Sequence, residues 1–133
     1  MIHAVADTHA LIWYAYADAR LSPSALAAFE GAAAEGEQIG FSTISLVEMV
    51  YLVEKGRVQV EALDQLLAAI DNPDSVLVEL PVDHEVAIAM QQISRDTVPD
   101  MPDRIIAATA LQHKIPVISR DSQIRLSEVR TIW

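Results

Sequence analysis

Short apolar runs alternate with longer helical stretches along this chain. Helical character appears in six segments: 8–17, 21–36, 43–56, 60–70, 83–93 and 102–114. Five short runs between them are predicted to be strands: 2–6, 38–42, 75–82, 115–119 and 130–133. Strands that alternate with helices or helix pairs predict a five-stranded, mainly parallel sheet with helices on both faces.

Several residues mark where these helices begin and end. Ser22 and Pro23 are a favoured N-cap and first helical residue, and Gly36 ends the helix that they open. Gly56 stops the third helix, and the residues from 95 to 101 are predicted to form a loop.

The length and composition indicate one globular domain over residues 1–133. Apolar residues make up 52% of the chain and charged residues 21%, which excludes a disordered protein. No uncharged run approaches the ~18 residues of a membrane span, and Asp7 within the first apolar stretch argues against a signal peptide. The absence of cysteine excludes disulfides and thiolate metal sites and fits a cytoplasmic location.

Three acidic residues are predicted to lie near the carboxyl ends of strands. Asp7 directly follows the first strand, Asp121 comes two residues after the strand 115–119, and Asp103 lies in the first turn of the helix before that strand. Parallel sheets place their functional sites at this edge.

Glu48 is a fourth unusual acid, because the helix that carries it is apolar on nearly all sides. Between Ile44 and Val53 only Ser45 and Glu48 are polar, and their spacing of three puts them on one face of the helix. A narrow polar stripe on a buried helix predicts contact with something that accepts negative charge.

Each acid also has a purely structural interpretation. Asp7 could cap the helix that follows it, and Ser45-x-x-Glu48 matches a capping box. Asp121 could open a turn. Carboxylates near the start of a helix are favoured by its dipole, which is the preferred interpretation of Asp100 and an alternative for Asp103. The joint pattern of the four acids, more than any one of them, favours a shared site.

Four converging carboxylates would need cations, because two of them ~4 Å apart repel by roughly 4 kcal/mol at an effective dielectric constant of 20. An all-oxygen site favours Mg²⁺ or Mn²⁺, and a pair of such ions can hydrolyse a phosphodiester. His9, two residues from Asp7, could support such a site, whereas the other histidines are scattered.

The residues around the four acids resemble PIN-domain nucleases, and among these the VapC-like toxins of bacterial toxin–antitoxin pairs. The likeness rests on "ADTHALIW", "STISLVEMVYLVEKGRV", "PDRIIAATA" and "VISRDSQI", which occur in the family's order. It implies a three-layer α/β/α sandwich and a Mg²⁺- or Mn²⁺-dependent endoribonuclease. It also implies a homodimer silenced by a cognate antitoxin.

The resemblance also implies roles for individual residues. It assigns metal binding and catalysis to four acids: Asp7, Glu48, Asp103 and Asp121. Small hydroxyl residues that support such a site would be Thr8, Ser45 and Ser119.

The net charge of −10 has the wrong sign for a protein that acts on RNA. Attraction for the substrate would have to be local, through the metal ions and the nearby Arg104, Arg120 and Arg125. The same acidity suits an antitoxin with a basic tail, one Arg of which would enter the acidic site.

Two other classes of protein fit part of the pattern. A different α/β phosphoryl-transfer enzyme would place a second acid close to Asp7, where this chain has His9. A non-catalytic acidic interaction module would use its acids only as helix caps, and it would not respond to divalent ions.

Overall fold

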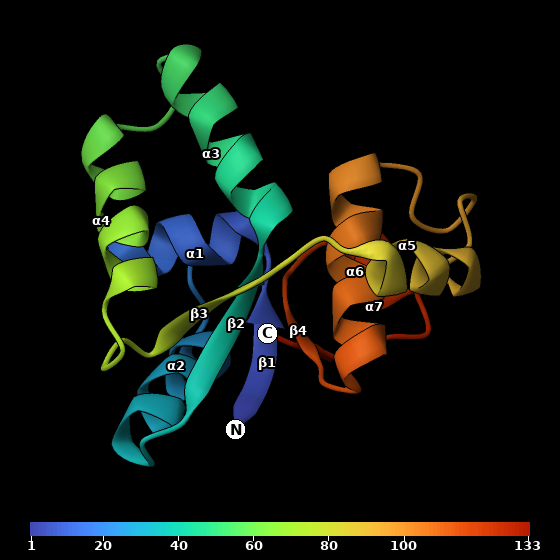
Figure 1. Ribbon diagram of the computed structural model, residues 1–133, viewed down its shortest axis with the longest axis horizontal. Helices are drawn as coiled ribbons and strands as arrows, with labels where there is room; N and C mark the ends of the chain where they lie inside the picture. Colours follow the sequence, from blue (N-terminus) through green and yellow to red (C-terminus); the bar gives the residue numbers. More distant parts are fainter.

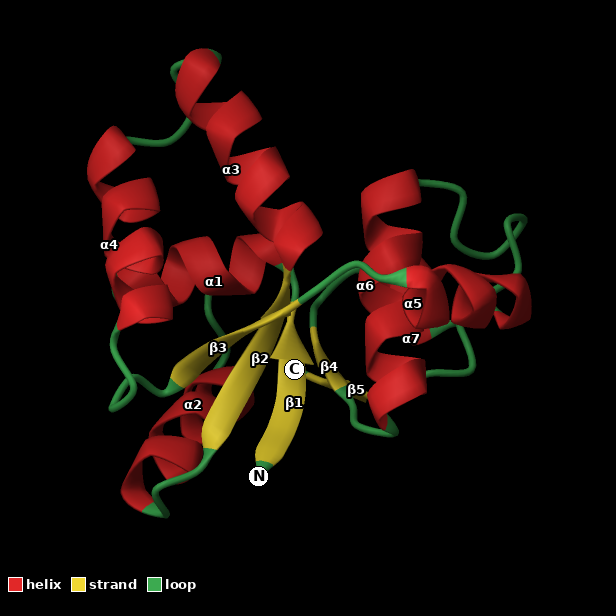
Figure 2. Ribbon diagram, in the orientation of Figure 1, coloured by secondary structure: helices red, strands yellow, loops and turns green.

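The computed structural model describes residues 1–133, which form one five-stranded sheet with helices packed on both of its faces (Figures 1 and 2). The strand order is β3-β2-β1-β4-β5, and every neighbouring pair is parallel. The strands are β1 (Ile2–Ala6), β2 (Gln38–Ser42), β3 (Leu77–Leu80), β4 (Val117–Ile118) and β5 (Thr131–Ile132). The predicted five-stranded α/β architecture is confirmed, and the sheet that was expected to be mainly parallel is wholly so.

The helices follow the predicted segments closely, with ends that differ by a few residues. They are α1 (Thr8–Ala15), α2 (Pro23–Ala34), α3 (Thr43–Glu54), α4 (Val60–Asp71), α5 (His84–Ala89), a 3₁₀ turn η1 (Met90–Gln92), α6 (Met101–His113) and α7 (Ser122–Arg125). The short helix α7 has no counterpart among the predicted elements, because four residues are too few to carry a periodic pattern.

The sheet separates two hydrophobic cores, and the alternation of β1 shows why. Ala4 and Ala6 point into the core formed with α1, α2 and α4, while Val5 points into the core formed with α5, α6 and α7. All three residues are fully buried, as expected for a parallel strand that is covered on both faces. The result is a three-layer α/β/α sandwich, with α6 standing against the centre of the sheet (Figure 1).

Helices α3 and α4 form a hairpin that extends beyond the carboxyl ends of the strands (Figure 2). Helix α3 begins directly after β2, and its first turn lies beside the first turn of α1 (Figure 1). None of the helices is both long enough and apolar enough to cross a membrane.

The hydrophobic core on the α1 side of the sheet should dominate stability. Phe41 on β2 is fully buried there, so Phe41→Ala should lower the free energy of unfolding by about 3–5 kcal/mol. Ile88→Ala on α5 removes a side chain that is 59% exposed and should change stability by less than about 0.5 kcal/mol. Urea unfolding of both variants tests this difference, and equal effects would contradict the described core.

Candidate active site

Asp7, Asp103 and Asp121 line one hollow at the carboxyl ends of β1 and β4, together with His9, Trp13 and Arg120. Strand β1 leads to β2 on one side of the sheet and pairs with β4 on its other side, so the order reverses between β1 and β4. This reversal is the point at which open parallel sheets form their binding crevices. The structure therefore places these three acids at the carboxyl edge of the sheet, where the sequence predicted the site.

Asp7 both caps a helix and faces the hollow. Its Oδ1 accepts the backbone N–H of Ala10 at 2.8 Å, which makes it the N-cap of α1. The residue is only 7% exposed, yet no Lys or Arg lies within ion-pair distance of it. The capping interpretation is correct, but it does not compete with a role in the site, because Oδ2 makes no backbone hydrogen bond.

Glu48 belongs to a network that joins α3 to the start of α1. The Thr8 hydroxyl donates to Glu48 Oε1 at 2.5 Å, and Thr8 Oγ1 lies 2.9 Å from Ser45 Oγ. Because Thr8 gives its one proton to Glu48, Ser45 is the donor to Thr8. The network holds one Glu48 oxygen and orients the carboxyl group toward the other acids.

The capping-box interpretation of Ser45 and Glu48 is wrong. Helix α3 begins at Thr43 with Ser42 as its N-cap, whose Oγ accepts the backbone N–H of Ile44 at 3.1 Å. Ser45 therefore lies inside the first turn, and Glu48 is one turn further along. Neither side chain bonds to the backbone of its own helix.

Asp103 is held close to a second acid, Asp100, at the start of α6. Asp100 is the N-cap of α6, as preferred from the sequence, and its Oδ2 accepts the backbone N–H of Asp103 at 3.1 Å. The carboxyl group of Asp103 itself accepts no hydrogen bond from the protein, so both of its oxygens remain available.

Asp121 is fixed by both of its neighbouring elements. Its Oδ1 accepts backbone N–H groups of Gln123 and Ile124, which makes it the N-cap of α7, and its own N–H donates to the hydroxyl of Ser119. The alternative that Asp121 opens a turn is close to what the structure shows, because the residue begins a helix of a single turn. As with Asp7, capping occupies one carboxylate oxygen and leaves the other.

The acids influence one another electrostatically, which shows that they share one neighbourhood. Burial, followed by repulsion from Asp100, Asp121, Glu48 and Asp7, raises the pKa of Asp103 from 3.8 to about 7. Burial is also the main cause that raises the pKa of Asp7 and that of Glu48. Hydrogen bonding from the Ser119 hydroxyl opposes the shift at Asp7, and the Thr8 hydroxyl opposes it at Glu48.

This donor set fits a hard divalent cation. The oxygens are carboxylates and hydroxyls, and no basic side chain forms an ion pair with them. Burial, followed by repulsion from the neighbouring acids, raises the pKa of Asp103. No three of these acids have oxygens that all lie within 4.8 Å of one another. Such spacing suits Mg²⁺, which keeps several of its waters and binds through only one or two carboxylates.

Two of the arginines predicted to bind substrate differ in position. Arg120 lines the hollow, and its side chain is exposed. Arg104 instead donates its Nε–H to the carbonyl of Ile93 and an Nη2–H to that of Met90, at 2.9 and 2.8 Å. Its guanidinium thus holds the end of the α5–η1 segment against α6, and these contacts do not support the predicted role of Arg104.

Three residues of the site have a weaker signal in the sequence or none. His9 lines the hollow and lies close enough to Asp7 and Glu48 to lower their pKa values, so its proximity to the site agrees with the supporting position weighed for it. The charge of Asp100 reaches Glu48 and Asp103, a role that its helix-capping spacing did not reveal. Trp13 is a core residue of α1, and only the fold brings its ring to the hollow.

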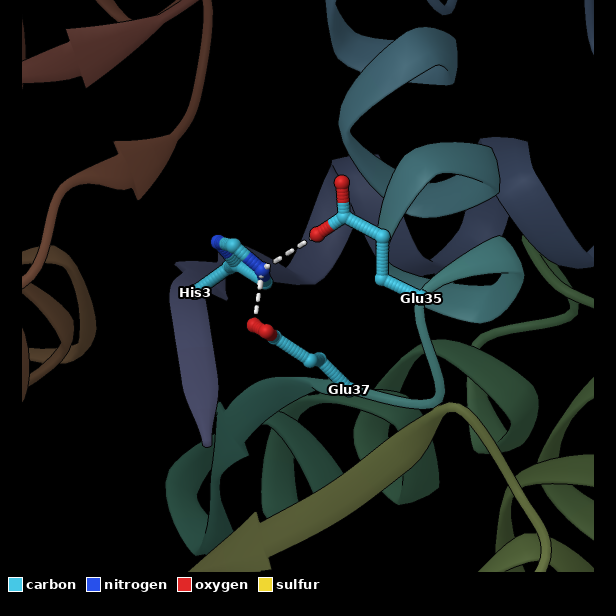
Figure 3. A group of neighbouring side chains, drawn as sticks. All are labelled: His3, Glu35 and Glu37. Carbon is cyan, nitrogen blue, oxygen red and sulfur yellow. Dashed lines mark ion pairs between the residues drawn. The ribbon is translucent and has the colours of Figure 1, made fainter.

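A second group of possible metal ligands lies at the opposite, amino-terminal end of the strands (Figure 3). His3 on β1 forms ion pairs through Nε2 with Glu35 Oε2 at 3.5 Å and with Glu37, which flank the turn into β2. These three residues have ligand atoms within 4.8 Å of one another. They are separate from the acidic hollow, and their contacts join β1 to the segment between α2 and β2.

A family model for the PIN domain matches residues 4–130, nearly the entire chain. The chain belongs to the PIN domain family. PIN domains are metal-dependent nucleases, so membership supports a hydrolase that acts on nucleic acids. The family predicted from the four acidic segments is thereby confirmed. A sequence comparison with curated proteins finds no match.

Three solved structures share this PIN fold over nearly the full length of both chains. VapBC2 from Rickettsia felis, bound to a DNA fragment from its promoter, has a TM-score of 0.72 at 15% identity and covers 98% of this chain and 97% of that one. A toxin–antitoxin complex from Klebsiella pneumoniae has a TM-score of 0.68 at 21% identity, covering 98% and 96%. FitAcB from Neisseria gonorrhoeae has a TM-score of 0.58 at 22% identity, covering 98% and 96%.

The raised pKa of Asp103 predicts how stability depends on pH when no metal is bound. The folded state holds a proton up to about pH 7, whereas the unfolded state releases it near 3.8, so the folded state binds more protons between these values. The melting temperature of the metal-free protein should therefore fall as pH rises from about 4 to 7 and then level off.

Asp103→Asn should flatten this slope and raise the melting temperature at pH 7.5, since it removes the charge that the other acids repel. Asp64→Asn, which neutralises an exposed carboxylate on α4, is the matched control and should keep the parental slope. Thermal melts in EDTA across this pH range provide the measurement. A parental slope in Asp103→Asn would show that the pKa of Asp103 is not raised in the folded protein.

Proposed function

We propose that this PIN domain is a Mg²⁺- or Mn²⁺-dependent endoribonuclease and the toxin of a toxin–antitoxin pair. The observation that carries the proposal is the set of carboxylates at the switch point of the sheet, buried enough to raise the pKa of Asp103 to about 7 and paired with no basic residue. Burial of these carboxylates and their mutual repulsion oppose the stability that Asp7 and Asp121 contribute as helix caps. A bound cation would offset the repulsion between the acids.

The residues divide the work of holding the cation and the substrate. Asp7 and Asp103 are the main candidate ligands, since one is fixed by the backbone of α1 and the other has both oxygens available. Glu48 and Asp121 each keep one oxygen in a structural hydrogen bond and offer the other. When bound, a divalent ion lowers the pKa of water and neutralises the leaving oxygen of a phosphodiester.

Thr8, Ser45 and Ser119 act through the acids. The two hydroxyls on α1 and α3 fix the direction of Glu48, and the hydroxyl after β4 supports the loop of Asp121 and faces Asp7. Preorganised carboxylates need not rotate when a cation arrives, which preserves binding free energy. We assign these three residues a supporting role.

The burial of Asp7 disfavours the alternative that this chain is a non-catalytic module whose acids only cap helices. An N-cap needs one carboxylate oxygen in contact with backbone N–H groups at a helix end, and an exposed position serves this as well as a buried one. Asp7 is 7% exposed, and its pKa is raised by burial, so its position costs more than capping requires.

Catalysis should depend on the two best-placed acids. Asp7→Asn and Asp103→Asn keep the side-chain shape but remove ligand charge, so each should lower the rate of RNA cleavage at least ~100-fold, or about 2.7 kcal/mol of barrier. EDTA should abolish cleavage, and added Mg²⁺ or Mn²⁺ should restore it. Asp64→Asn serves again as the control and should cleave normally.

Rates are measured on a labelled single-stranded RNA with purified variants whose melting curves show that they are folded. Unchanged cleavage in both variants would point to a contaminating nuclease or another site. Cleavage that survives exhaustive removal of metal would contradict the proposed chemistry.

The proposed partner is an antitoxin whose basic tail lies on this acidic surface and brings an Arg into the hollow. The chain's net charge of −10 favours a basic ligand, and a planar guanidinium can pair with a carboxylate through two hydrogen bonds. An apolar groove between α1, α4 and β3 would take the rest of the tail; its apolar lining includes Leu11, Tyr14, Met49, Ala62, Leu66 and Leu77. We expect part of the exposed α3 surface, around Val47 and Tyr51, to form a homodimer.

Binding of the protein encoded beside this one should weaken when the tail's Arg becomes Ala, and Mg²⁺ should compete with the tail because both require the same acids. Calorimetric titration with and without Mg²⁺ measures both effects. Tight binding that responds to neither change would mean that inhibition works by covering the RNA path, away from the acids.

A further inference from the structure

Trp13 on α1 lies beneath two guanidinium groups that come from distant parts of the chain. The Arg120 guanidinium carbon is 4.5 Å from the centroid of the indole ring, and that of Arg20 is 5.1 Å from it. The ring itself is only 4% exposed and also packs against His9 and Trp133. Such contacts between a guanidinium and an indole are attractive and favour a fixed position of the cation.

Arg120 shares the hollow with three carboxylates, yet it pairs with none of them. Asp7, Asp103 and Asp121 line the same cavity, but no oxygen of theirs lies within 4.0 Å of a nitrogen of Arg120. A flexible arginine beside three anions would ordinarily bridge to one. Stacking on Trp13 accounts for its separation from them and leaves its N–H groups without a protein partner.

Arg20 is held by an ion pair with Asp18. Its Nε–H and Nη2–H donate to the two carboxylate oxygens of Asp18 at 3.1 and 2.8 Å, and these hydrogen bonds lower the pKa of Asp18 to about 2. This two-point contact fixes the plane of the guanidinium beside Trp13. Arg20 is exposed and does not line the acidic hollow, but it contacts the same indole ring as Arg120.

An RNA strand presents phosphates at regular intervals, and only one of them is cut in the acidic hollow. The neighbouring phosphates need donors, because the surface as a whole repels them at a net charge of −10. Arginine is suited to this contact, since its planar N–H groups match phosphate oxygens. The two arginines over Trp13 are cations of this kind, one in the hollow and one beside it.

We propose that Arg120 and Arg20 form a binding subsite for the RNA phosphates next to the cleaved one, and that Trp13 is the positioning residue that presents both guanidiniums. This inference rests on the proposed ribonuclease function, and it specifies which part of the substrate is recognised. The ligand class is the phosphodiester backbone of single-stranded RNA, bound without reading its bases.

The test separates binding from cleavage. Fluorescence anisotropy of a labelled 12-mer RNA, with Ca²⁺ in place of Mg²⁺, gives the dissociation constant over a range of salt concentrations. Arg120→Ala should weaken binding at least tenfold and reduce the slope of log K against log salt by about 0.7, the value for one lost phosphate contact on a single strand. Arg20→Ala should have a smaller effect of the same kind.

Arg57→Ala is the matched control, because it removes one positive charge from the exposed turn between α3 and α4. It should leave the dissociation constant within about twofold of the parent and the salt slope unchanged. An equal loss in Arg57→Ala would show that only net charge matters, and this result would overturn the subsite.

Trp13 is tested by substitution and by coupling. Trp13→Leu removes the aromatic face and should weaken binding as much as Arg120→Ala, with little further loss in the double variant because both changes remove one interaction. Trp13→Phe keeps an aromatic face and should bind RNA more tightly than Trp13→Leu even where the two melting temperatures are equal, which a role in core packing alone would not produce. Arg120→Lys keeps the charge but not the planar stack, and it should bind more weakly than the parent.

Cleavage measured on the same variants distinguishes the two proposals. If the parent binds RNA through these arginines but never cleaves it, the proposed ribonuclease function fails and the subsite stands. If the parent cleaves RNA while Arg120→Ala and Arg20→Ala bind as tightly as Arg57→Ala, the subsite is overturned and the ribonuclease stands. Failure of the parent to bind RNA at all would also overturn the subsite.

Discussion

Repulsion among carboxylates that are held partly out of water is the interaction on which the rest of this site depends. The parallel sheet brings the ends of β1 and β4 together; Asp7 follows β1 at once, and Asp121 follows β4 after Ser119 and Arg120. The starts of α3 and α6 approach the same edge and add Glu48, Asp100 and Asp103. Partial burial, followed by the neighbouring charges, raises the pKa of Asp103, so a bound cation would relieve the cost of ionising this carboxyl group.

Helix capping and metal binding are compatible here because a carboxylate has two oxygens. Asp7 and Asp121 each use Oδ1 for backbone N–H groups at a helix start, and Glu48 uses Oε1 for the hydroxyl of Thr8. One oxygen thereby fixes the orientation of the group, and the other makes no hydrogen bond to the backbone. Local structure and the chemistry of the site are thus served by the same side chains.

Contacts within the protein also fix the positions of the arginines near the site. The chain carries nine basic residues against nineteen acidic ones, so long-range attraction cannot bring RNA to it. Arg104 is committed to backbone carbonyls between α5 and α6, while Arg120 is kept in the hollow by the indole of Trp13. An aromatic ring attracts a cation without neutralising its charge, which is why the arginine stays available beside three carboxylates.

The sequence alone determined the order of elements and a mainly parallel sheet, and it singled out the acids proposed for the site, because burial on both faces and residues at strand ends leave local patterns. Asp7, Asp103 and Asp121 follow such patterns, and Glu48 stands out on an apolar helix. Only the tertiary structure decided the rest. The tertiary structure forms the hydrogen bond between Thr8 and Glu48, the contacts of Trp13 with two arginines, and the hydrogen bonds of Arg104 to backbone carbonyls. The geometry of these contacts depends on how the helices pack across the sheet. No local pattern encodes a contact of that kind.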